Sequence, residues 1–380
     1  MFLFYCKIVK KSIIKEKSTP HIIRSTEDFQ RNFWDRIANC LTGIRPSWRL
    51  HLGHYKWALE NWLHIQDNPN IQNNFLIADY QVLWDYLWDT NRLRNSVIDM
   101  IIDWLAIWLN PKKSNFIIQS YVPEFAELFN LLTMFTPYNL ATNNPTLKDE
   151  MKKIENREWI NNAISLWFVN YPVSQVADIM LLKWEIVPVG EDQIPHIELS
   201  RSIIKKVNNM YGTTFPLPMA MISKTPRLVW TDWNDKMSKS LWNTIYLTSS
   251  LNEIKKWVNS MYTDPWKISI FSSWNIDNHV VFKYLDIFYD DKNHIEELKR
   301  RYIEGGKNSV WDGELKQLLI KILNELVSPI REKREFYKQN IPLVVSSIEE
   351  WSENARKIWQ EVLSELKENM GIIWYGNEFR

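Results

Sequence analysis

The sequence TGIRPSWRLHLGH, at residues 42–54, is a turn-rich loop that leads into a probable helix. The amides and the positive dipole end at the start of a helix attract anions. Gly53 would let a base or a ribose approach the backbone closely, and His51 and His54 could donate hydrogen bonds to phosphate oxygens. The loop therefore predicts a nucleotide site, although HLGH alone is equally compatible with two ordinary histidines at a helix start.

Downstream of this loop, short apolar runs alternate with longer stretches of helical spacing. The clearest runs are residues 75–78, 116–118 and 186–189, which have the length and apolar content of buried strands. Strands that alternate with helices form a parallel sheet covered by helices. The sequence therefore predicts an α/β domain around the loop.

The last third of the chain has a different pattern. After about Tyr246 the strand-like runs become sparse, and residues 295–302, 315–327 and 348–370 show amphipathic helical spacing with many Lys/Glu pairs. Residues 1–35 are polar and mixed, and they read as a poorly ordered extension. We therefore expect three parts: an extension at 1–35, a parallel-sheet domain at 36–243 and a helical domain at 244–380.

Composition excludes several classes of protein. The 380 residues contain 46 Lys and Arg against 45 Asp and Glu, so any basic surface that binds nucleic acid must be local. Cys6 and Cys40 are too few for a disulfide framework or a thiolate metal centre, which suits a reducing cytoplasm. No apolar run approaches the roughly 18 residues of a membrane span, and we find no export signal. We expect a globular cytoplasmic protein.

Tryptophan and glycine occur in unusual numbers. The chain has 21 tryptophans and only 9 glycines, whereas glycine averages about 7% of residues in globular proteins. The two types together are about as frequent as ordinary glycine and ordinary tryptophan combined. Many tryptophans could therefore stand where glycine is expected.

A second candidate phosphate-binding segment is KMSKS, at residues 236–240. Lys236 and Lys239 flank small hydroxyl residues, and a turn precedes them. In a mobile loop their ammonium groups could stabilise the charge that develops on pyrophosphate as it leaves. A lone match of this length is more often a solvated Lys/Ser loop, so its weight comes from its order and its separation from HLGH.

The segment VPVGEDQIPH, at residues 187–196, looks like the end of a core strand followed by a glycine turn and an acidic loop. Ligands of open α/β sheets bind at the carboxyl ends of the strands. Gly190 to Gln193 would project there. Taken alone, the acidic residues could equally belong to a solvated loop between a strand and a helix.

Asp178 is a carboxylate within an otherwise apolar helical pattern, YPVSQVADI at residues 171–179. A buried aspartate needs a hydrogen-bonding partner, whereas most aspartates inside helices face water or a salt bridge. A substrate contact and an ordinary salt bridge are both compatible with this pattern.

HLGH near the start of an alternating β/α domain and KMSKS at its end form the paired signature of class I aminoacyl-tRNA synthetases. From about Leu41 to Gly371 the sequence resembles the tryptophanyl-tRNA synthetases. The matching motifs are HLGHY (51–55), LIADYQ (76–81), FIIQS (116–120), NPTLKDE (144–150), YPVSQVAD (171–178), VPVGEDQ (187–193), PRL (226–228), KMSKS (236–240) and MYTDP (261–265).

The resemblance implies a Rossmann-like parallel-sheet catalytic domain, with the KMSKS loop at its end, and a C-terminal α-helical domain that binds the tRNA anticodon. It implies a homodimer. It also implies that ATP, carrying Mg²⁺, converts L-tryptophan to tryptophanyl-adenylate, and that the tryptophanyl group then passes to tRNA(Trp). The protein would need no metal site of its own.

The resemblance also assigns roles to individual residues. Catalysis would fall to His51, His54, Lys236 and Lys239. The residues expected to contact ATP are Arg45, Pro46, Ser47, Gly53, His54, Gly190, Glu191, Asp192, Leu228, Lys236, Met237, Ser238, Lys239 and Ser240. Those expected to bind tryptophan are Asp178, which would read the indole N–H, Tyr171 and Gln193, which would orient the ammonium and carboxylate groups, and Ala78, Gln81, Val187 and Val189, which would line the pocket.

The chain departs from this family mainly at one residue type. The family usually has glycine where this chain has Trp48, Trp57, Trp108, Trp167, Trp230, Trp233 and Trp242. A tryptophan-rich core or an aromatic nucleic-acid surface would not select glycine positions. We hypothesise that the codon UGA, translated here as tryptophan, specifies glycine in the source organism, whereas Trp62 and Trp104 are genuine.

Two other functions are compatible with the sequence. A tyrosyl-tRNA synthetase would share the fold, both signatures and the Gln-x-x-Asp spacing of Gln175 and Asp178, although the GEDQ-x-x-H form favours tryptophan. A noncatalytic tRNA-binding relic would result if the tryptophans at glycine positions are real, because Trp48 would put an indole in the ATP loop. The intact HLGH, GEDQ and KMSKS motifs argue against such decay.

Overall fold

The structure, a computed structural model, describes residues 21–33, 36–46, 49–83, 89–155, 164–222, 244–263, 276 and 279–372. Ser47, Leu228 and residues 236–240, which are predicted to contact ATP, lie outside the described residues. The same is true of Trp48, Trp230, Trp233 and Trp242.

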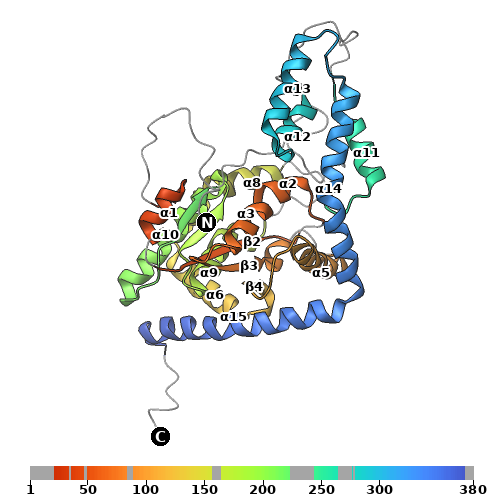
Figure 1. Ribbon diagram of the computed structural model, residues 1–380. Helices are drawn as coiled ribbons and strands as arrows, with labels where there is room; N and C mark the ends of the chain where they lie inside the picture. The colour runs from red at the N-terminus through yellow and green to blue at the C-terminus, as the bar shows by residue number, and fades with distance from the viewer. Residues whose placement is uncertain are drawn as a thin grey trace.

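A six-stranded, fully parallel sheet forms the centre of the structure (Figure 1). The strand order is β1-β6-β5-β2-β3-β4, so the direction of winding reverses between β2 and β5. The strands predicted from apolar runs are confirmed as β3, β4 and β5, and the predicted α/β class is confirmed. The strands are β1 (Ile22–Ile23), β2 (Ala38–Ile44), β3 (Ile71–Ile77), β4 (Ser114–Ile118), β5 (Ile186–Val189) and β6 (Met219–Ile222).

Helices cover both faces of this sheet because alternate strand residues are apolar on each side. On one face Phe75 and Phe116 contact Trp62 and Trp104. On the other face Leu76 packs with helices α6, α9 and α10. The helices of the sheet domain are α1 (Thr26–Phe33), α2 (Leu52–His54), the π-helical turn η1 (Tyr55–Leu59), α3 (Glu60–Gln66), α4 (Asp79–Leu83), α5 (Thr90–Ala106), the 3-10 turn η3 (Gln119–Tyr121), α6 (Glu124–Phe135), α7 (Tyr138–Thr142), α8 (Pro145–Glu155), α9 (Leu166–Leu181), the 3-10 turn η4 (Glu191–Gln193) and α10 (Ile194–Tyr211).

The last third of the described chain is helical, as predicted. It comprises α11 (Leu251–Asn259), α12 (Val280–Phe288), α13 (Lys292–Glu304), α14 (Asp312–Gln339) and α15 (Ile341–Asn369). The three amphipathic segments predicted in this region are confirmed as parts of α13, α14 and α15. No helix within the described ranges is long and apolar enough to cross a membrane.

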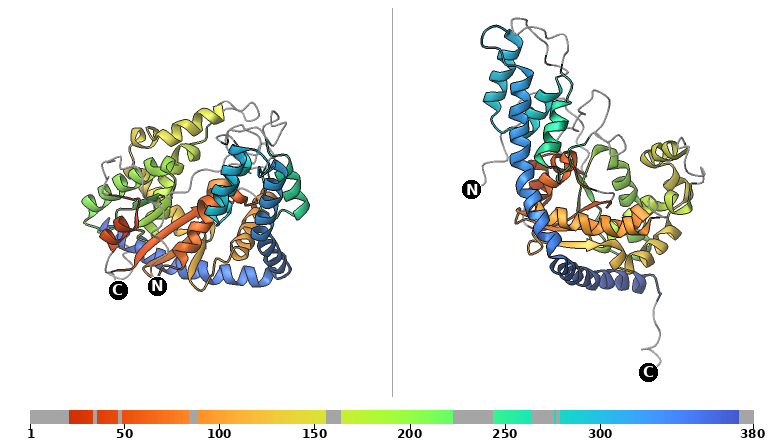
Figure 2. Two further views of the ribbon diagram at one scale, coloured as in Figure 1. Left: turned by 45° about the horizontal axis from the view of Figure 1, so that its top comes forward. Right: turned by 90° about the vertical axis from the view of Figure 1, so that its right-hand side faces the viewer.

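The position of α15 differs from the expected division into domains. α14 lies against α5, α11 and α12, whereas α15 turns away and passes along the sheet domain, against β4, α6 and α9 (Figure 2). Trp359, Leu363 and Leu366 are buried there. Among the described residues, α15 therefore packs mainly on the sheet domain. The amphipathic pattern of α15 predicts that one face is buried but not which surface buries it.

Part of the expected N-terminal extension belongs to the fold. Ile22 and Ile23 form β1, which pairs in parallel with Ala220 and Met221 of β6. In α1, Phe33 packs into a cluster with Ile23 and the start of β2. The expectation of poor order is therefore wrong for residues 21–33. The two-residue strand β1 is too short to give a recognisable sequence pattern.

The end of α5 has the geometry of a helix that glycine terminates. Trp108 has a φ of +69°. Its N–H donates to the Leu105 carbonyl at 3.2 Å, and the Leu109 N–H donates to the Trp104 carbonyl at 3.1 Å. These two bonds define a Schellman motif, whose left-handed residue is usually glycine. The backbone thus supports the glycine hypothesis at Trp108, whereas Trp62 and Trp104 are buried and in ring contact with each other.

The variant Trp108→Gly is expected to be more stable than the chain as written, by about 1 kcal/mol, because a left-handed conformation costs an L-residue roughly 1–2 kcal/mol. Loss of the contact between the Trp108 ring and the Lys333 ammonium, 4.6 Å from the ring centroid, offsets part of this gain. Urea denaturation measures the difference. The control Trp104→Gly removes a fully buried side chain and should cost about 3–5 kcal/mol; equal destabilisation by both changes would contradict the assignment of position 108.

Candidate active site

The predicted binding residues meet at the carboxyl edge of the parallel sheet. Arg45 follows β2, Ala78 follows β3 and Gly190 follows β5. The Ala78 N–H donates to the Ile44 carbonyl at 3.1 Å, which joins the ends of β3 and β2. The edge includes the point between β2 and β5 where the winding reverses, which is the usual ligand position in such sheets.

Asp178 lies in α9 with 4% of its surface exposed. Gln119, at the end of β4, donates its side-chain Nε2 to both Asp178 carboxylate oxygens, at 2.8 and 3.0 Å. Burial raises the pKa of Asp178 well above its usual value, the Gln119 hydrogen bond lowers it, and the charge of Asp79 raises it. The sequence is compatible with either a substrate contact or a salt bridge at Asp178. The described contacts of Asp178 do not include a salt bridge.

The Asp178 and Gln119 pair has unused capacity for hydrogen bonds. A carboxylate offers about four acceptor positions, and Gln119 occupies two. The Oε1 atom of Gln119 is buried without a hydrogen-bond partner among the described residues. A buried N–H or O–H donor from a ligand would therefore be stabilised here. Gln119 was not among the predicted site residues, although it lies in the matching segment FIIQS (116–120), directly after β4.

A chain of buried polar groups fixes Tyr171. Its hydroxyl lies 3.3 Å from His196 Nε2, and His196 Nδ1 lies 3.2 Å from the side-chain nitrogen of Asn144. Burial lowers the pKa of His196 to about 4, so the imidazole is neutral at physiological pH. Because the Asn144 amide donates to Nδ1, the proton is on Nε2 and is donated to the Tyr171 oxygen.

This tautomer leaves the Tyr171 proton available to the Glu150 carboxylate. Burial raises the pKa of Tyr171, and the charge and hydrogen bond of Glu150 raise it further. Asn144 also accepts the N–H groups of Thr146 and Leu147 at the start of α8, at 3.0 and 3.2 Å. His196, Asn144 and Glu150 were not among the predicted site residues. Only the fold brings them to Tyr171.

The acidic turn after β5 is attached to the same network. Gly190 caps η4, and the Gln193 N–H donates to its carbonyl at 2.9 Å. The Gln193 side chain donates to Asp192 at 3.0 Å, and the Thr146 hydroxyl donates to the Asp192 carbonyl at 2.8 Å. Glu191 is exposed and accepts a hydrogen bond from Arg24 at 2.8 Å. The turn therefore projects where the sequence predicts.

Residues predicted to line the tryptophan pocket lie at or after the carboxyl ends of β3 and β5. Val187 is buried and Val189 is half-buried at the end of β5. Ala78 is buried, and Gln81 is half-buried one turn later in α4.

The HLGH segment forms a reciprocal cap at the start of α2. The His51 N–H donates to His54 Nδ1 at 3.2 Å, and the His54 N–H donates to His51 Nδ1 at 3.3 Å. Their ring centroids are 3.6 Å apart. Gly53 is half-buried, Pro46 is buried and Arg45 is exposed. The helix then continues through η1, which contains Trp57, so that a π-helical turn follows the predicted nucleotide loop directly.

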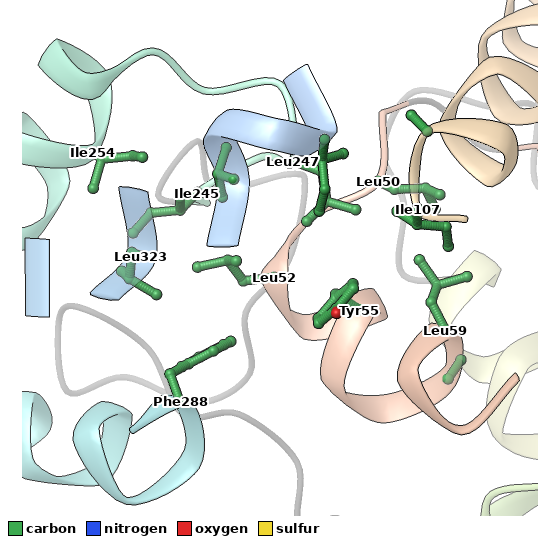
Figure 3. Packing of buried hydrophobic residues seen from close by; sticks show 14 of the residues in the cluster. Leu50, Leu52, Tyr55, Leu59, Ile107, Ile245, Leu247, Ile254, Phe288 and Leu323 are labelled. Atoms are coloured by element: carbon green, nitrogen blue, oxygen red, sulfur yellow. The ribbon is translucent and has the colours of Figure 1, made fainter. Parts of the chain in front are cut away.

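An antiparallel bridge between His51 and Tyr246 joins this segment to the chain that follows KMSKS. The Leu52 N–H donates to the Ile245 carbonyl and the Leu247 N–H donates to the Leu50 carbonyl, both at 3.0 Å. Figure 3 shows the apolar side chains that surround this bridge. Tyr246 comes six residues after Ser240, the last residue of KMSKS. The bridge therefore joins HLGH to a segment that begins shortly after KMSKS.

Trp167, in the first turn of α9, is half-buried and packs against the cluster that contains Tyr171. In the ranges that the structure describes, no group of three or more His, Cys, Asp or Glu residues could hold a metal ion.

Comparison with known proteins gives consistent results. The family model of class I tRNA synthetases (W and Y) matches residues 35–328. The chain is 40% identical to the tryptophan–tRNA ligase of Clostridium longisporum, over 89% of this chain and 98% of that protein. It is 38% identical to the Streptococcus pyogenes protein of the same name, over 88% of this chain and 98% of that protein.

Solved structures agree with this result. The tryptophanyl-tRNA synthetase of Campylobacter jejuni, complexed with ADP and tryptophan, is 33% identical and superposes with a TM-score of 0.77, over 88% of this chain and 99% of that chain. The Mycoplasma pneumoniae tryptophanyl-tRNA synthetase, at 20% identity and a TM-score of 0.70, supports the fold alone.

Proposed function

Because the chain belongs to the class I tRNA synthetases of the W and Y family, we propose that the carboxyl edge of its sheet activates L-tryptophan with ATP and that the tryptophanyl group then passes to tRNA(Trp). The chain is an aminoacyl-tRNA ligase with a Rossmann-like sheet and a C-terminal helical region. Its relatives at 38–40% identity are tryptophan–tRNA ligases, which favours tryptophan over tyrosine. The observation that carries the site assignment is the buried Asp178 and Gln119 pair, with acceptor positions left for one more donor.

Tryptophan would bind with its indole N–H on Asp178. Ala78, Gln81, Val187 and Val189 would surround the ring, and Tyr171 and Gln193 would hold the ammonium and carboxylate groups. The buried chain from Asn144 through His196 supports this role for Tyr171, because it fixes the hydroxyl before the substrate arrives. An amino acid without a ring donor would leave the Asp178 carboxylate unpaired, which is the condition for strong discrimination.

The tryptophan carboxylate would attack the α-phosphorus of ATP in line, with departure of pyrophosphate. The ATP contacts would be Arg45, Pro46, Ser47, Gly53, His54, Gly190, Glu191, Asp192, Leu228 and residues 236–240. Lys236, Lys239 and the two histidines would stabilise the charge that moves onto the phosphates, and Mg²⁺ would enter with ATP as part of the substrate. This chemistry needs orientation and charge stabilisation rather than a nucleophile of the protein.

The remaining parts of the proposal concern assembly and location. The helices from α11 to α14 would bind tRNA, two chains would form a homodimer, and the protein would act in the cytoplasm. Because adenylate formation consumes only tryptophan and ATP, it is expected to be measurable without tRNA.

The test is exchange of labelled pyrophosphate into ATP by the full-length protein carrying glycine at the seven positions where the family has it. Tryptophan should support exchange, and the kcat/KM for tyrosine should be at least about 10²-fold lower than that for tryptophan, because contacts to a matched ring donor discriminate strongly. A preference for tyrosine would identify the tyrosyl enzyme. Absence of exchange with either amino acid would identify the noncatalytic relic.

A further inference from the structure

Arg334 is a buried cation outside the proposed substrate site. It lies in α14 with 3% of its surface exposed. Its Nε donates to Asp103 of α5 at 2.6 Å, and its Nη2 donates to Asp99, one turn earlier in α5, at 2.6 Å. Asp103 is 1% exposed. A buried ion pair commonly contributes little more to stability than apolar residues of the same size, so stability alone gives a weak reason for this one.

Asp103 has a second partner in Leu50, directly before the HLGH segment. Burial raises the pKa of Asp103 to about 6, whereas the charge and hydrogen bond of Arg334 and the backbone hydrogen bond of Leu50 lower it. The Leu50 carbonyl accepts the Leu247 N–H, and the next residue is His51, which caps α2. Asp103 therefore holds the residue directly before the first histidine of the signature.

A second arginine of α14 holds the opposite side of the same bridge. Arg331, one turn before Arg334, donates to the Ser249 carbonyl at 2.8 Å. Ser249 follows the bridge residues Ile245 to Leu247. Leu323 of the same helix lies among the apolar residues beside the bridge (Figure 3). Helix α14 is thus linked to both chain segments that the bridge joins: Arg331 contacts Ser249 directly, and Arg334 pairs with Asp103, the partner of Leu50.

We propose that Asp103 and Arg334 are positioning residues for the adenylation step, and this inference rests on the function proposed above. They fix the Leu50 backbone, and through it the His51 turn, relative to the segment that continues from KMSKS. Neither residue is proposed to touch a substrate. Because both signature segments would act on the same phosphates, a shift of about 1 Å between them could lower the rate by roughly 10²-fold without changing the tryptophan pocket.

The test compares two double variants with matched packing. Asp103→Leu with Arg334→Met replaces both charges with apolar side chains, which avoids an unpaired buried charge and removes the acceptor for Leu50. Asp103→Asn with Arg334→Gln also removes both charges but keeps a side-chain acceptor for the Leu50 N–H. We expect kcat for pyrophosphate exchange to fall at least about 10-fold in the Leu/Met variant and to be largely retained in the Asn/Gln variant, with the KM for tryptophan unchanged in both.

Two further measurements separate positioning from folding and from the proposed function. Hydrogen exchange of the Leu50 and Leu247 amides should accelerate in the Leu/Met variant only, whatever the activity of the protein. Asp99→Asn, which removes only the half-exposed partner of Arg334, should leave kcat unchanged. Normal kcat in a folded Leu/Met variant, or equal amide protection in both double variants, would overturn the proposal. Failure of the unaltered protein to exchange pyrophosphate with tryptophan would instead overturn the proposed function.

Discussion

Asp178→Ala is expected to lower kcat/KM for tryptophan by about 10²-fold or more, because a hydrogen bond to a charged group contributes about 1.5–3 kcal/mol and the buried pocket is built around it. Binding of ATP should remain, since the carboxylate is assigned to the indole rather than to phosphate. Steady-state pyrophosphate exchange and equilibrium dialysis of ATP measure the two quantities. Loss of both together would show that the residue supports the fold instead of the amino-acid pocket.

The free energy of unfolding of an Asp178 variant provides a control, because it should rise while the activity falls. Burial raises the pKa of Asp178 in the folded chain, so its contribution to stability is fully present below the ordinary aspartate value of about 4 and is lost as the pH rises through the raised value. At pH values above the raised pKa the ionised group therefore opposes folding. Asp178→Asn should raise the free energy of unfolding by about 1 kcal/mol while tryptophan activation falls.

Glycine at the seven family positions is expected to raise the exchange rate at least about 10²-fold over the chain as written, since small displacements in a phosphate site have effects of this size. Pro46 and Leu50, which flank Trp48 on its two sides, are both buried, and Leu50 is hydrogen-bonded to the segment after KMSKS. Because the residues on both sides of position 48 are held in place, we expect an indole there to interfere with ATP.

Peptide mass spectrometry of the native protein across residues 41–56 measures the residue at position 48 directly. Glycine is expected there and, in the adjoining peptide, at position 57, and the left-handed backbone of Trp108 supports the same substitution at position 108. As controls, Trp62→Gly and Trp104→Gly should destabilise the protein, because these two rings pack against each other in the core. Tryptophan at position 48 of the native protein, or full activity of the literal sequence, would contradict the recoding hypothesis.

The sequence predicted the elements whose signal is local. The apolar runs gave β3, β4 and β5, and the amphipathic segments gave α13, α14 and α15. It could not predict that α15 packs under the sheet or that β1 extends it, because the partner surfaces lie far away in the chain. The same distinction holds at the site: Asp178 stood out within its helix, whereas its partner Gln119 is 59 residues away and only the shared edge of the sheet brings them together.

The hydrogen bonds that fix Tyr171 could not be predicted from local sequence patterns either. His196 and Asn144 occur within motifs that the sequence resemblance includes, but a resemblance does not say which atoms meet. Their hydrogen bonds follow from the packing of α8 and α10 against α9. Trp108 is different, because the resemblance to the family implied glycine there and the Schellman geometry of the backbone is an independent physical reason for it.

The most direct test of the account compares tryptophan with its benzothiophene analogue, in which sulfur replaces the indole N–H in a ring of nearly the same shape. The ratio of kcat/KM values for the two amino acids is measured in pyrophosphate exchange, in the glycine-restored protein and in its Asp178→Ala variant. The account predicts a preference for tryptophan of roughly 10²-fold or more in the first protein and nearly equal use of both amino acids in the second. Equal use by the first protein, or an undiminished preference in the variant, would contradict the assignment of Asp178 to the indole N–H.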